Sequence, residues 1–137
     1  LHATVEGKPI LRGIDLTLGL DDGLPRVRGD GERIRQLLLN LLFNAADALG
    51  GQGSIALRAS NGGGLVRLTV EDDGPGIDEA ILDQVFDPFV TTKPSGQGTG
   101  LGLAVCHTIV ERLGGTIEAR NLASGGASFE VRLPAAT

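Results

Sequence analysis

The sequence predicts an α+β fold, a two-layer sandwich with helices packed on one face of a mixed, mostly antiparallel sheet. Two observations predict it. Most strand-like segments occur in pairs joined by glycine-rich turns, and one long helical segment precedes each pair. The order also lacks the regular alternation of one strand with one helix that is typical of doubly wound parallel folds. We therefore expect a sheet with one helical layer.

Five segments have the alternating or β-branched pattern of strands. The first alternates apolar and polar residues, as a half-buried strand does. The next two are joined by the turn Asn61-Gly62-Gly63-Gly64 and predict a hairpin, and the last two form a similar pair. The predicted strands are residues 14–20, 53–60, 65–72, 116–121 and 127–133.

Two helices are predicted between these strands. Asp30 can cap the first, which runs to about Leu49 and stops at a glycine pair. The second runs from about Thr99 to Leu113 and stops at another glycine pair. These two segments would form the helical layer.

A long segment between the hairpin and the second helix has little regular structure. Residues 73–98 are rich in Gly, Pro, Asp and Thr, and only a short helix is expected near residues 78–85. Segments of this length inside a compact domain are usually functional.

The composition excludes several classes of protein. The chain has 137 residues, the size of one domain, and its 41% hydrophobic and 21% charged residues argue against disorder. A formal net charge of −5 disfavours nucleic-acid binding. The single cysteine, Cys106, excludes an internal disulfide and a multi-cysteine zinc site. It is expected in the core, and a chain with only one cysteine fits a cytoplasmic location.

The chain is expected to be a piece of a longer protein, because it contains no methionine even at position 1. No apolar run approaches the roughly 18 residues of a membrane span, and no signal peptide is seen.

A line of polar residues runs along the first predicted helix. Residues 37–49 are apolar nearly all round, which predicts a largely buried helix. Four polar residues still fall on one line along it: Gln36, Asn40, Asn44 and Asp47. Either these side chains contact water or polar neighbours in the sheet, or they line the floor of a ligand or metal site. Oxygen donors of this kind suit Mg²⁺.

An acidic residue stands where the predicted strand 65–72 ends. The apolar face of this strand includes Val70, and Asp72 takes the next position on the same face. Gly74 and Gly76 follow, and glycines let a ligand approach the backbone closely. An ordinary turn with an exposed acid is common, but an inward carboxylate beside two glycines is better suited to accept a hydrogen bond from a ligand's amine.

Four alternating glycines lead into the second predicted helix. Free amides and the positive end of the helix dipole make such a helix start an anion site, naturally for phosphates. The spacing matches neither the dinucleotide fingerprint nor the P-loop. A flexible hinge would explain any one glycine, but it is a weaker explanation of the whole set: Gly96, Gly98, Gly100 and Gly102.

Two aromatic residues and one cation precede these glycines. Phe86 and Phe89 are half of the four phenylalanines and can anchor a mobile loop on the core. Lys93 is a cation near the expected phosphate site, although a solvated surface lysine is the alternative.

Together these motifs resemble the ATP-binding catalytic domain of a bacterial sensor histidine kinase. That family belongs to the superfamily of gyrase, heat-shock chaperone, histidine kinase and mismatch-repair ATPases. The resemblance spans about residues 10–134, with four boxes in order, and residues 125–134 are similar to the family's closing strand. The matching boxes are Asn40 to Asn44 (asparagine box), Asp72 to Ile77 (first glycine box), Phe86 to Phe89 (phenylalanine box) and Gly98 to Leu103 (second glycine box).

The resemblance implies a domain organisation. Residues 1–9 would be a linker or a frayed N-terminal segment, residues 10–134 the catalytic domain, and residues 135–137 a C-terminal tail. The ATP lid would span about residues 78–98. The phenylalanine box continues into Thr91-Thr92-Lys93, which resembles the nitrogen-regulation and dicarboxylate-sensing subgroup.

The resemblance also implies roles for individual residues. Asn44 would bind Mg²⁺, and Asp72 would accept a hydrogen bond from the exocyclic amine of adenine. Lys93 would reach a phosphate when the lid closes, with Phe86 and Phe89 as lid anchors. The residues implied to bind ATP are Asn40, Asn44, Asp47, Ala48, Asp72, Gly74, Gly76, Ile77, Val90, Thr92, Lys93, Gly98, Thr99, Gly100, Leu101 and Gly102.

Three positions have consequences for the chemistry. Asp47 stands where many family members carry a basic residue, and Ala48 replaces an aromatic one. Phosphate neutralisation would therefore depend more on Mg²⁺, Lys93 and helix amides. Asn40 stands where the superfamily ATPases use a glutamate base, and an amide cannot take a proton from water. We therefore expect a poor ATPase.

The resemblance places the nucleophile outside this chain. His2 is not followed by an acid and His107 lies in a predicted helix, so neither is expected to accept the phosphoryl group. No residue of the chain is assigned as nucleophile or base. The expected partners are the protein's own dimerisation domain and the receiver domain of a response regulator, and the chain by itself is expected to be monomeric.

Two alternative functions remain open. One is an anti-sigma-type protein-serine kinase of the same superfamily. The other is a nucleotide-sensing module that binds ATP and transfers nothing. A topoisomerase or chaperone ATPase is disfavoured by Asn40.

Overall fold

The structure, a computed structural model, describes residues 14–20, 31–49, 52–87 and 102–134. The predicted Asp30 cap, Gly50-Gly51 and the predicted helix start at residues 99–101 lie outside these ranges, as do residues 1–9 and 135–137. In chain order the elements are β1 (Ile14–Leu20), α2 (Gly31–Leu49), β2 (Gly53–Gly62), β3 (Leu65–Asp72), the 3₁₀ turn η2 (Leu82–Gln84), α3 (Gly102–Arg112), β4 (Thr116–Asn121) and β5 (Ala127–Pro134).

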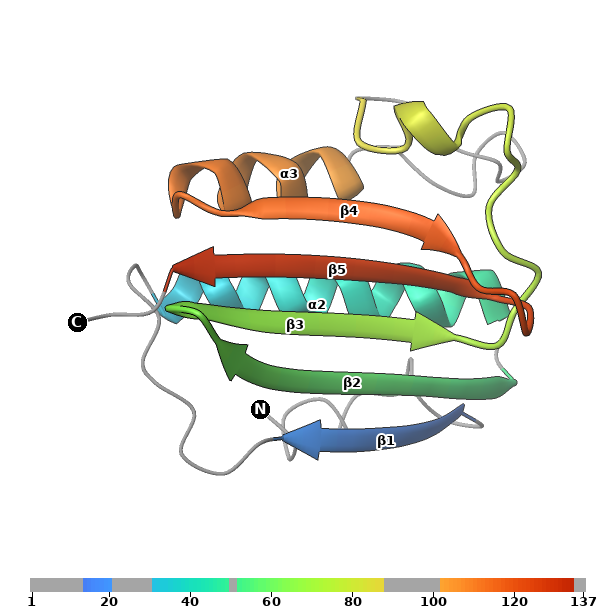
Figure 1. Ribbon diagram of the computed structural model, residues 1–137. Helices are drawn as coiled ribbons and strands as arrows, with labels where there is room; N and C mark the ends of the chain where they lie inside the picture. The colour runs from blue at the N-terminus through green and yellow to red at the C-terminus, as the bar shows by residue number, and fades with distance from the viewer. Residues whose placement is uncertain (1–13, 21–30, 50–51, 88–101, 135–137) are drawn as a thin grey trace.

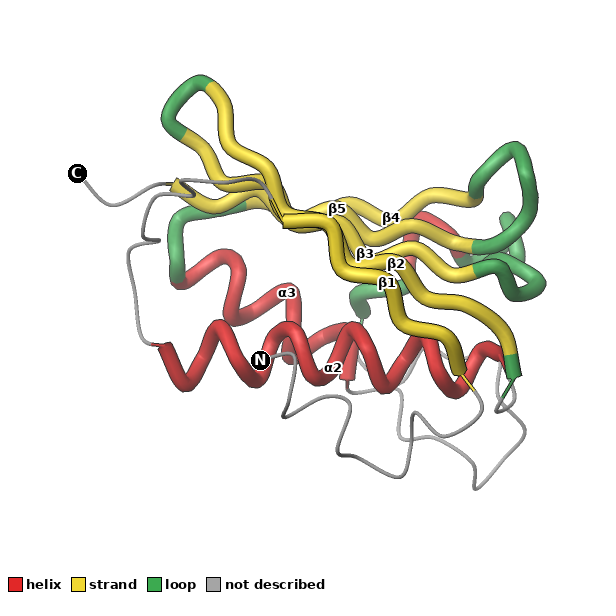
Figure 2. The backbone as a smooth tube through the Cα atoms, turned by 90° about the horizontal axis from the view of Figure 1, so that it is seen from below, coloured by secondary structure: helices red, strands yellow, loops and turns green. Residues whose placement is uncertain are grey.

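The five strands form one sheet in the order β1-β2-β3-β5-β4 (Figure 1). β1 pairs with β2 in parallel, and the other neighbours are antiparallel. Both helices lie on the same face of this sheet (Figure 2). The predicted two-layer α+β fold, with a mixed and mostly antiparallel sheet, is therefore confirmed.

The elements agree with the predicted ranges apart from small shifts. β2 and β5 are slightly longer than predicted. The short helix expected near residues 78–85 is only the three-residue turn η2. Neither helix in the described part of the chain is long and apolar enough to cross a bilayer.

The core lies between the sheet and the helices. Alternate residues of the three central strands point into it, including Ile55, Val70 and Phe129, each 2% exposed or less. Helix α3 contributes Cys106, Ile109 and others on one stripe. Cys106 is fully buried, as expected, and burial raises the pKa of its thiol to about 12.

Helix α2 is amphipathic rather than buried all round. Its buried residues form one stripe at helical spacing, which packs on the sheet and on α3. Outside this stripe Phe43 is 36% exposed and Leu39 is half-buried. The expectation of a largely buried helix was therefore too strong, because two layers cover only part of the helix. The buried stripe is Leu37, Leu38, Leu41, Leu42, Ala45 and Ala46.

Candidate functional site

Asp72 is a buried carboxylate at the end of a central strand. It continues the inward face of β3 and is 6% exposed, so the predicted inward orientation is confirmed. Two backbone N–H groups donate to its Oδ1, that of Gly74 at 2.9 Å and that of Ala127 at 3.3 Å. Within the described residues no hydrogen bond reaches Oδ2. One oxygen therefore fixes the side chain, and the other is left to accept from a ligand.

The electrostatics of Asp72 reflect this environment. Burial raises the pKa of the carboxyl above its ordinary value. The hydrogen bonds from Gly74 and Ala127 act in the opposite direction, and the charge of Asp73 raises the pKa further. The net increase shows that an ionised carboxylate is under-solvated here, which favours a partner that donates a hydrogen bond.

The turn after Asp72 is held from two sides by side-chain hydrogen bonds. On one side, Asp73 accepts from the backbone N–H of Ser54 at the start of β2, at 2.9 Å. On the other side, Asn121 at the end of β4 accepts from the N–H of Ile77 at 2.7 Å and donates to its carbonyl at 2.8 Å. The turn is thus hydrogen-bonded to β2 on one side and to β4 on the other.

Glycine allows the turn and the β4–β5 connection to touch. Gly126 has φ +95°, and a Cβ there would overlap the backbone of Asp72. Gly76 has φ +82°, and a Cβ there would lie 2.8 Å from Asn121 Oδ1. Both positions therefore require glycine for conformation and for space.

The end of helix α2 reaches the same turn. A Cβ at Gly74 would lie 3.3 Å from the side chain of Leu49 and 3.5 Å from the carbonyl oxygen of Ala48. The predicted residues Ala48, Asp72, Gly74, Gly76 and Ile77 are therefore gathered around one turn. The end of α2 and the turn after Asp72 are thus neighbours.

The polar line of α2 lies on the open side of the helix. Asn40 and Asn44 are half-buried, and Gln36 and Asp47 are exposed. In the described part of the chain neither asparagine side chain has a hydrogen-bond partner. The amide oxygens are therefore available to a ligand or to water, and both interpretations of the line remain consistent with its position.

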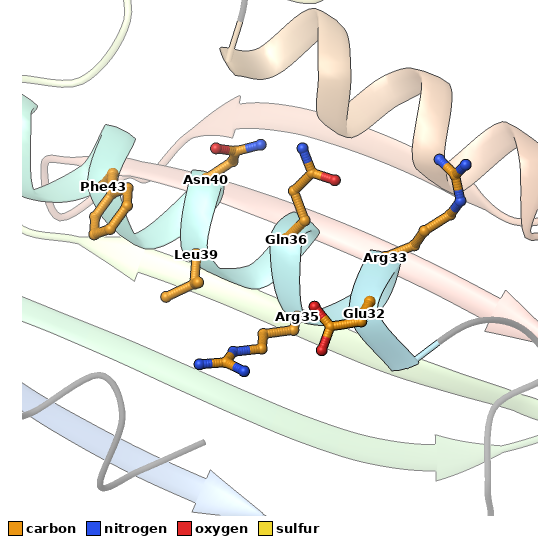
Figure 3. Close-up of a pocket in the computed structure, with 7 residues that line it drawn as sticks. All are labelled: Glu32, Arg33, Arg35, Gln36, Leu39, Asn40 and Phe43. Carbon is orange, nitrogen blue, oxygen red and sulfur yellow. The ribbon is translucent and has the colours of Figure 1, made fainter.

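A hollow of about 600 Å³ runs along this helix. Figure 3 shows Asn40, Gln36 and Arg33 on one side of α2 and Leu39 on the other. Asp72 does not line it, so the hollow by itself does not define an adenine pocket. The lining residues are Glu32, Arg33, Arg35, Gln36, Leu39, Asn40 and Phe43.

Phe86 packs against the core, and its role as a lid anchor stays a prediction. Its ring stacks on His107 of α3 at 5.8 Å and meets Phe129 of β5 edge-on at 6.2 Å. His107 in turn pairs with Glu111 at 3.1 Å. The start of the predicted lid is therefore attached to the helix that follows it.

Several predicted residues cannot be placed. Gly102 is the exposed first residue of α3, at the helix start where a phosphate was predicted. The other residues of the lid and second glycine box lie outside the described ranges: Phe89, Val90, Thr92, Lys93, Gly98, Thr99, Gly100 and Leu101.

One predicted metal ligand, Asn44, lies in the described part of the chain. The described residues contain no cluster of three or more His, Cys, Asp or Glu side chains that could hold a metal. Asn44 offers one amide oxygen. Mg²⁺ is commonly held by one or two protein oxygens together with substrate phosphates and water. The amide oxygen of Asn44 is a donor of the type that such a Mg²⁺ ion accepts.

Sequence reasoning missed three residues that shape the site: Ser54, Asn121 and Ala127. Ser54 and Ala127 act through backbone N–H groups, which no side-chain pattern reveals. The glycine pair at 125–126 was the available signal, because it marks the connection that approaches Asp72.

Comparisons with known proteins agree with this geometry. The family described as "Histidine kinase-, DNA gyrase B-, and HSP90-like ATPase" matches residues 29–137. The chain is 46% identical over 123 residues to the sensor histidine kinase ZraS of Escherichia coli O157:H7, an alignment that covers 90% of this chain and 26% of ZraS. The chain thus spans about a quarter of the length of that relative.

Solved structures show the same fold. The nucleotide-free catalytic domain of histidine kinase ThkA has a TM-score of 0.85 and 37% identity, covering 98% of this chain and 87% of that one. ThkA in complex with the response regulator protein TrrA has a TM-score of 0.81 and 33% identity, covering 98% and 38%.

The chain belongs to the histidine kinase-, DNA gyrase B- and HSP90-like ATPase family. Within that family it is an ATP-binding catalytic domain of the sensor histidine kinase type.

Proposed function

We propose that this domain binds Mg-ATP and presents the γ-phosphoryl group to a histidine on a separate dimerisation domain of the same protein. The observation that carries the proposal is Asp72, whose Oδ1 is held by two backbone amides while Oδ2 accepts no hydrogen bond from the described residues. A buried, under-solvated carboxylate at this position is suited to the exocyclic amine of adenine.

The chain's own residues would act by positioning. Asp72 orients the base, and the turn at Gly74 and Gly76 lets the adenine approach the backbone. The amide oxygen of Asn44 would hold Mg²⁺, which neutralises phosphate charge when bound. The N-terminus of α3 would face the phosphates. This leaves the domain to supply orientation and electrostatic stabilisation, the main terms in phosphoryl transfer.

The transfer step needs a nucleophile from elsewhere. A histidine ring nitrogen would form a bond to the γ-phosphorus as the bond to the β–γ bridging oxygen breaks, with ADP leaving. The phosphoryl group would then pass to a response regulator, in keeping with the partner seen with ThkA. Since these steps use ATP and a receiver domain, we propose that the domain lies in the cytoplasm. We also propose that the chain by itself is monomeric.

Calorimetric titration of ATP into the chain, with and without Mg²⁺, tests the binding step. We expect ATP binding that is tighter with Mg²⁺. We also expect hydrolysis by the isolated chain well below about 1 s⁻¹, because Asn40 cannot act as a base. Absence of binding in both conditions would contradict the nucleotide site.

Incubation of the full-length protein with γ-labelled ATP tests the transfer step. We expect label on a histidine outside this chain, followed by transfer to a receiver domain. Label on serine of a separate protein would favour the anti-sigma-type kinase instead. Binding without any transfer would favour the nucleotide-sensing module.

A further inference from the structure

The side-chain amide of Asn121 forms a hydrogen-bonded ring with the backbone of Ile77, in the turn after β3. Its Oδ1 accepts from the N–H of Ile77 at 2.7 Å, and its Nδ2 donates to the carbonyl of the same residue at 2.8 Å. The two residues are 44 positions apart in the chain. Both bonds are partly shielded from solvent, which makes them stronger than the same bonds in water.

This contact is linked to Asp72 through the pairing of β4 with β5. Asn121 pairs with Ala127 across β4 and β5, and Ala127 donates its N–H to Asp72 Oδ1. The turn beyond Asp72 is therefore fixed at Ile77 by one residue of this pair, and the carboxylate is fixed by the other. A Cβ at Gly76 would lie 2.8 Å from the Asn121 oxygen, so the turn passes close to the Asn121 side chain at this position.

The chemistry of the contact requires an amide at position 121. Only a carboxamide offers one acceptor and one donor at the spacing of a peptide group. Aspartate could accept from Ile77 N–H but would face the Ile77 carbonyl with a second oxygen. Leucine has a similar size and would make neither bond. The contact is thus specific for asparagine and can be removed without a large change in volume.

We propose that Asn121 is a positioning residue for adenine recognition. It holds the Gly76–Ile77 part of the turn so that Asp72 keeps its Oδ1 on the two backbone amides and its Oδ2 toward the base. This inference rests on the proposed nucleotide function for its ligand, but the positional part can be tested without any nucleotide.

The first measurement is amide hydrogen exchange by NMR on the nucleotide-free protein. We compare the wild-type chain with Asn121→Leu and Asn121→Asp, and use Arg120→Ala as the matched control. Arg120 is the exposed neighbour on the same strand, outside the site. Loss of both bonds should accelerate exchange of the Ile77 and Gly74 amides by about tenfold, with Val70 in the middle of β3 unchanged.

The second measurement is the ratio of affinities for ATP and inosine triphosphate, by calorimetry. Inosine has a carbonyl oxygen where adenine has its amine, so the ratio reports recognition at Asp72. We expect Asn121→Leu to lower the ATP affinity by about tenfold and to reduce the ratio, while Arg120→Ala leaves both unchanged.

The outcomes separate positioning from a purely structural role. If Gly74 exchange and the ATP-to-inosine ratio both stay at wild-type values in a folded variant, the inference is overturned. If Asn121→Leu does not fold, Asn121→Asp, which keeps one bond, is judged by the same two readouts. If the wild-type chain binds neither nucleotide, the proposed function fails, and unchanged or accelerated Gly74 exchange still decides whether Asn121 positions the turn.

Discussion

The turn after β3 and the polar line of α2 are both predicted to contact nucleotide, yet they are built in different ways. Around the turn, Asp72, Asp73 and Ile77 each take part in hydrogen bonds with residues from other strands. Along the helix, the side chains of Asn40 and Asn44 have no such partner in the described part of the chain.

The contrast suggests different requirements for recognising a base and for contacting a phosphate. A group that must tell one base from another benefits from being fixed before the ligand arrives, since less ordering is needed on binding. A group that contacts phosphate through a hydrated ion needs oxygen atoms within reach more than a fixed direction. Substitutions that remove a hydrogen bond of the turn or add a side chain to it should therefore lower the stability of the fold, whereas substitutions on the helix should change ligand binding alone.

The largest effect is expected where the turn touches the β4–β5 connection. Gly125 and Gly126 both have positive φ, at +99° and +95°. Alanine at either costs strain of about 1–2 kcal/mol, but only at Gly126 does the new Cβ overlap the Asp72 backbone. Gly126→Ala should therefore lower the free energy of unfolding by about 2 kcal/mol more than Gly125→Ala.

Urea unfolding followed by circular dichroism measures this difference, because the chain has no Trp or Tyr for fluorescence. Gly125→Ala is the matched control, and it should also keep its ATP affinity. Equal losses in the two variants would mean that the close approach at Asp72 does not contribute to stability.

Asp72→Asn should separate affinity from stability. Asparagine keeps an oxygen for the amides of Gly74 and Ala127, but the charged acceptor for the adenine amine is lost. ATP affinity should fall by about 30-fold, corresponding to about 2 kcal/mol for a hydrogen bond to a charged group. The melting temperature should not fall, because a neutral amide avoids the desolvation cost. Wild-type affinity in this variant would remove Asp72 from the site.

Much of this turn could be anticipated from the sequence, and part of it could not. Strand alternation alone placed Asp72 inward, since the period of two is a local property. The contacts of Asn121 and Ala127 depend on the register of β3, β5 and β4, which brings together residues 44 and 55 positions apart. No local pattern encodes such a register.

The helix shows the opposite error. Its leucine-rich sequence suggested a largely buried helix, whereas Phe43 remains 36% exposed. Periodicity identified a helix correctly, but composition does not say how many neighbours cover it. The polar line lies on the helix as predicted, while a ligand for it could be proposed only through the family resemblance.

A smaller effect, confined to the ligand, is expected on α2. Asn44→Ala should reduce the gain in ATP affinity that Mg²⁺ provides by about tenfold, the scale of one polar contact. Gln36→Ala is the control, because Gln36 lies on the same polar line but was not assigned to the site. Calorimetry with and without Mg²⁺ measures both. A similar loss in the absence of Mg²⁺ would show that Asn44 does not act through the metal.

Stability of either variant should stay close to that of the wild type, since neither side chain has a hydrogen-bond partner among the described residues. A large drop in unfolding free energy for Asn44→Ala would contradict this difference between the two regions, because it would mean that internal contacts also hold the Asn44 side chain.

The smallest effect concerns pH and returns to the buried carboxylate. The folded-state pKa of Asp72 is raised above 3.8, so between these two values the folded protein holds a proton that the unfolded chain has released. The contribution of Asp72 to stability is therefore full below pH 3.8 and decreases as pH rises through the folded-state pKa. Asparagine does not titrate, so the unfolding free energy of Asp72→Asn minus that of wild type should increase with pH over this window. Titrating groups that do not interact with Asp72 are shared and cancel in the difference, whereas Asp73, whose charge acts on Asp72, does not cancel fully. A difference that decreases with pH would mean that the amides of Gly74 and Ala127 outweigh burial, and that the carboxylate is already well solvated by the protein before any adenine arrives.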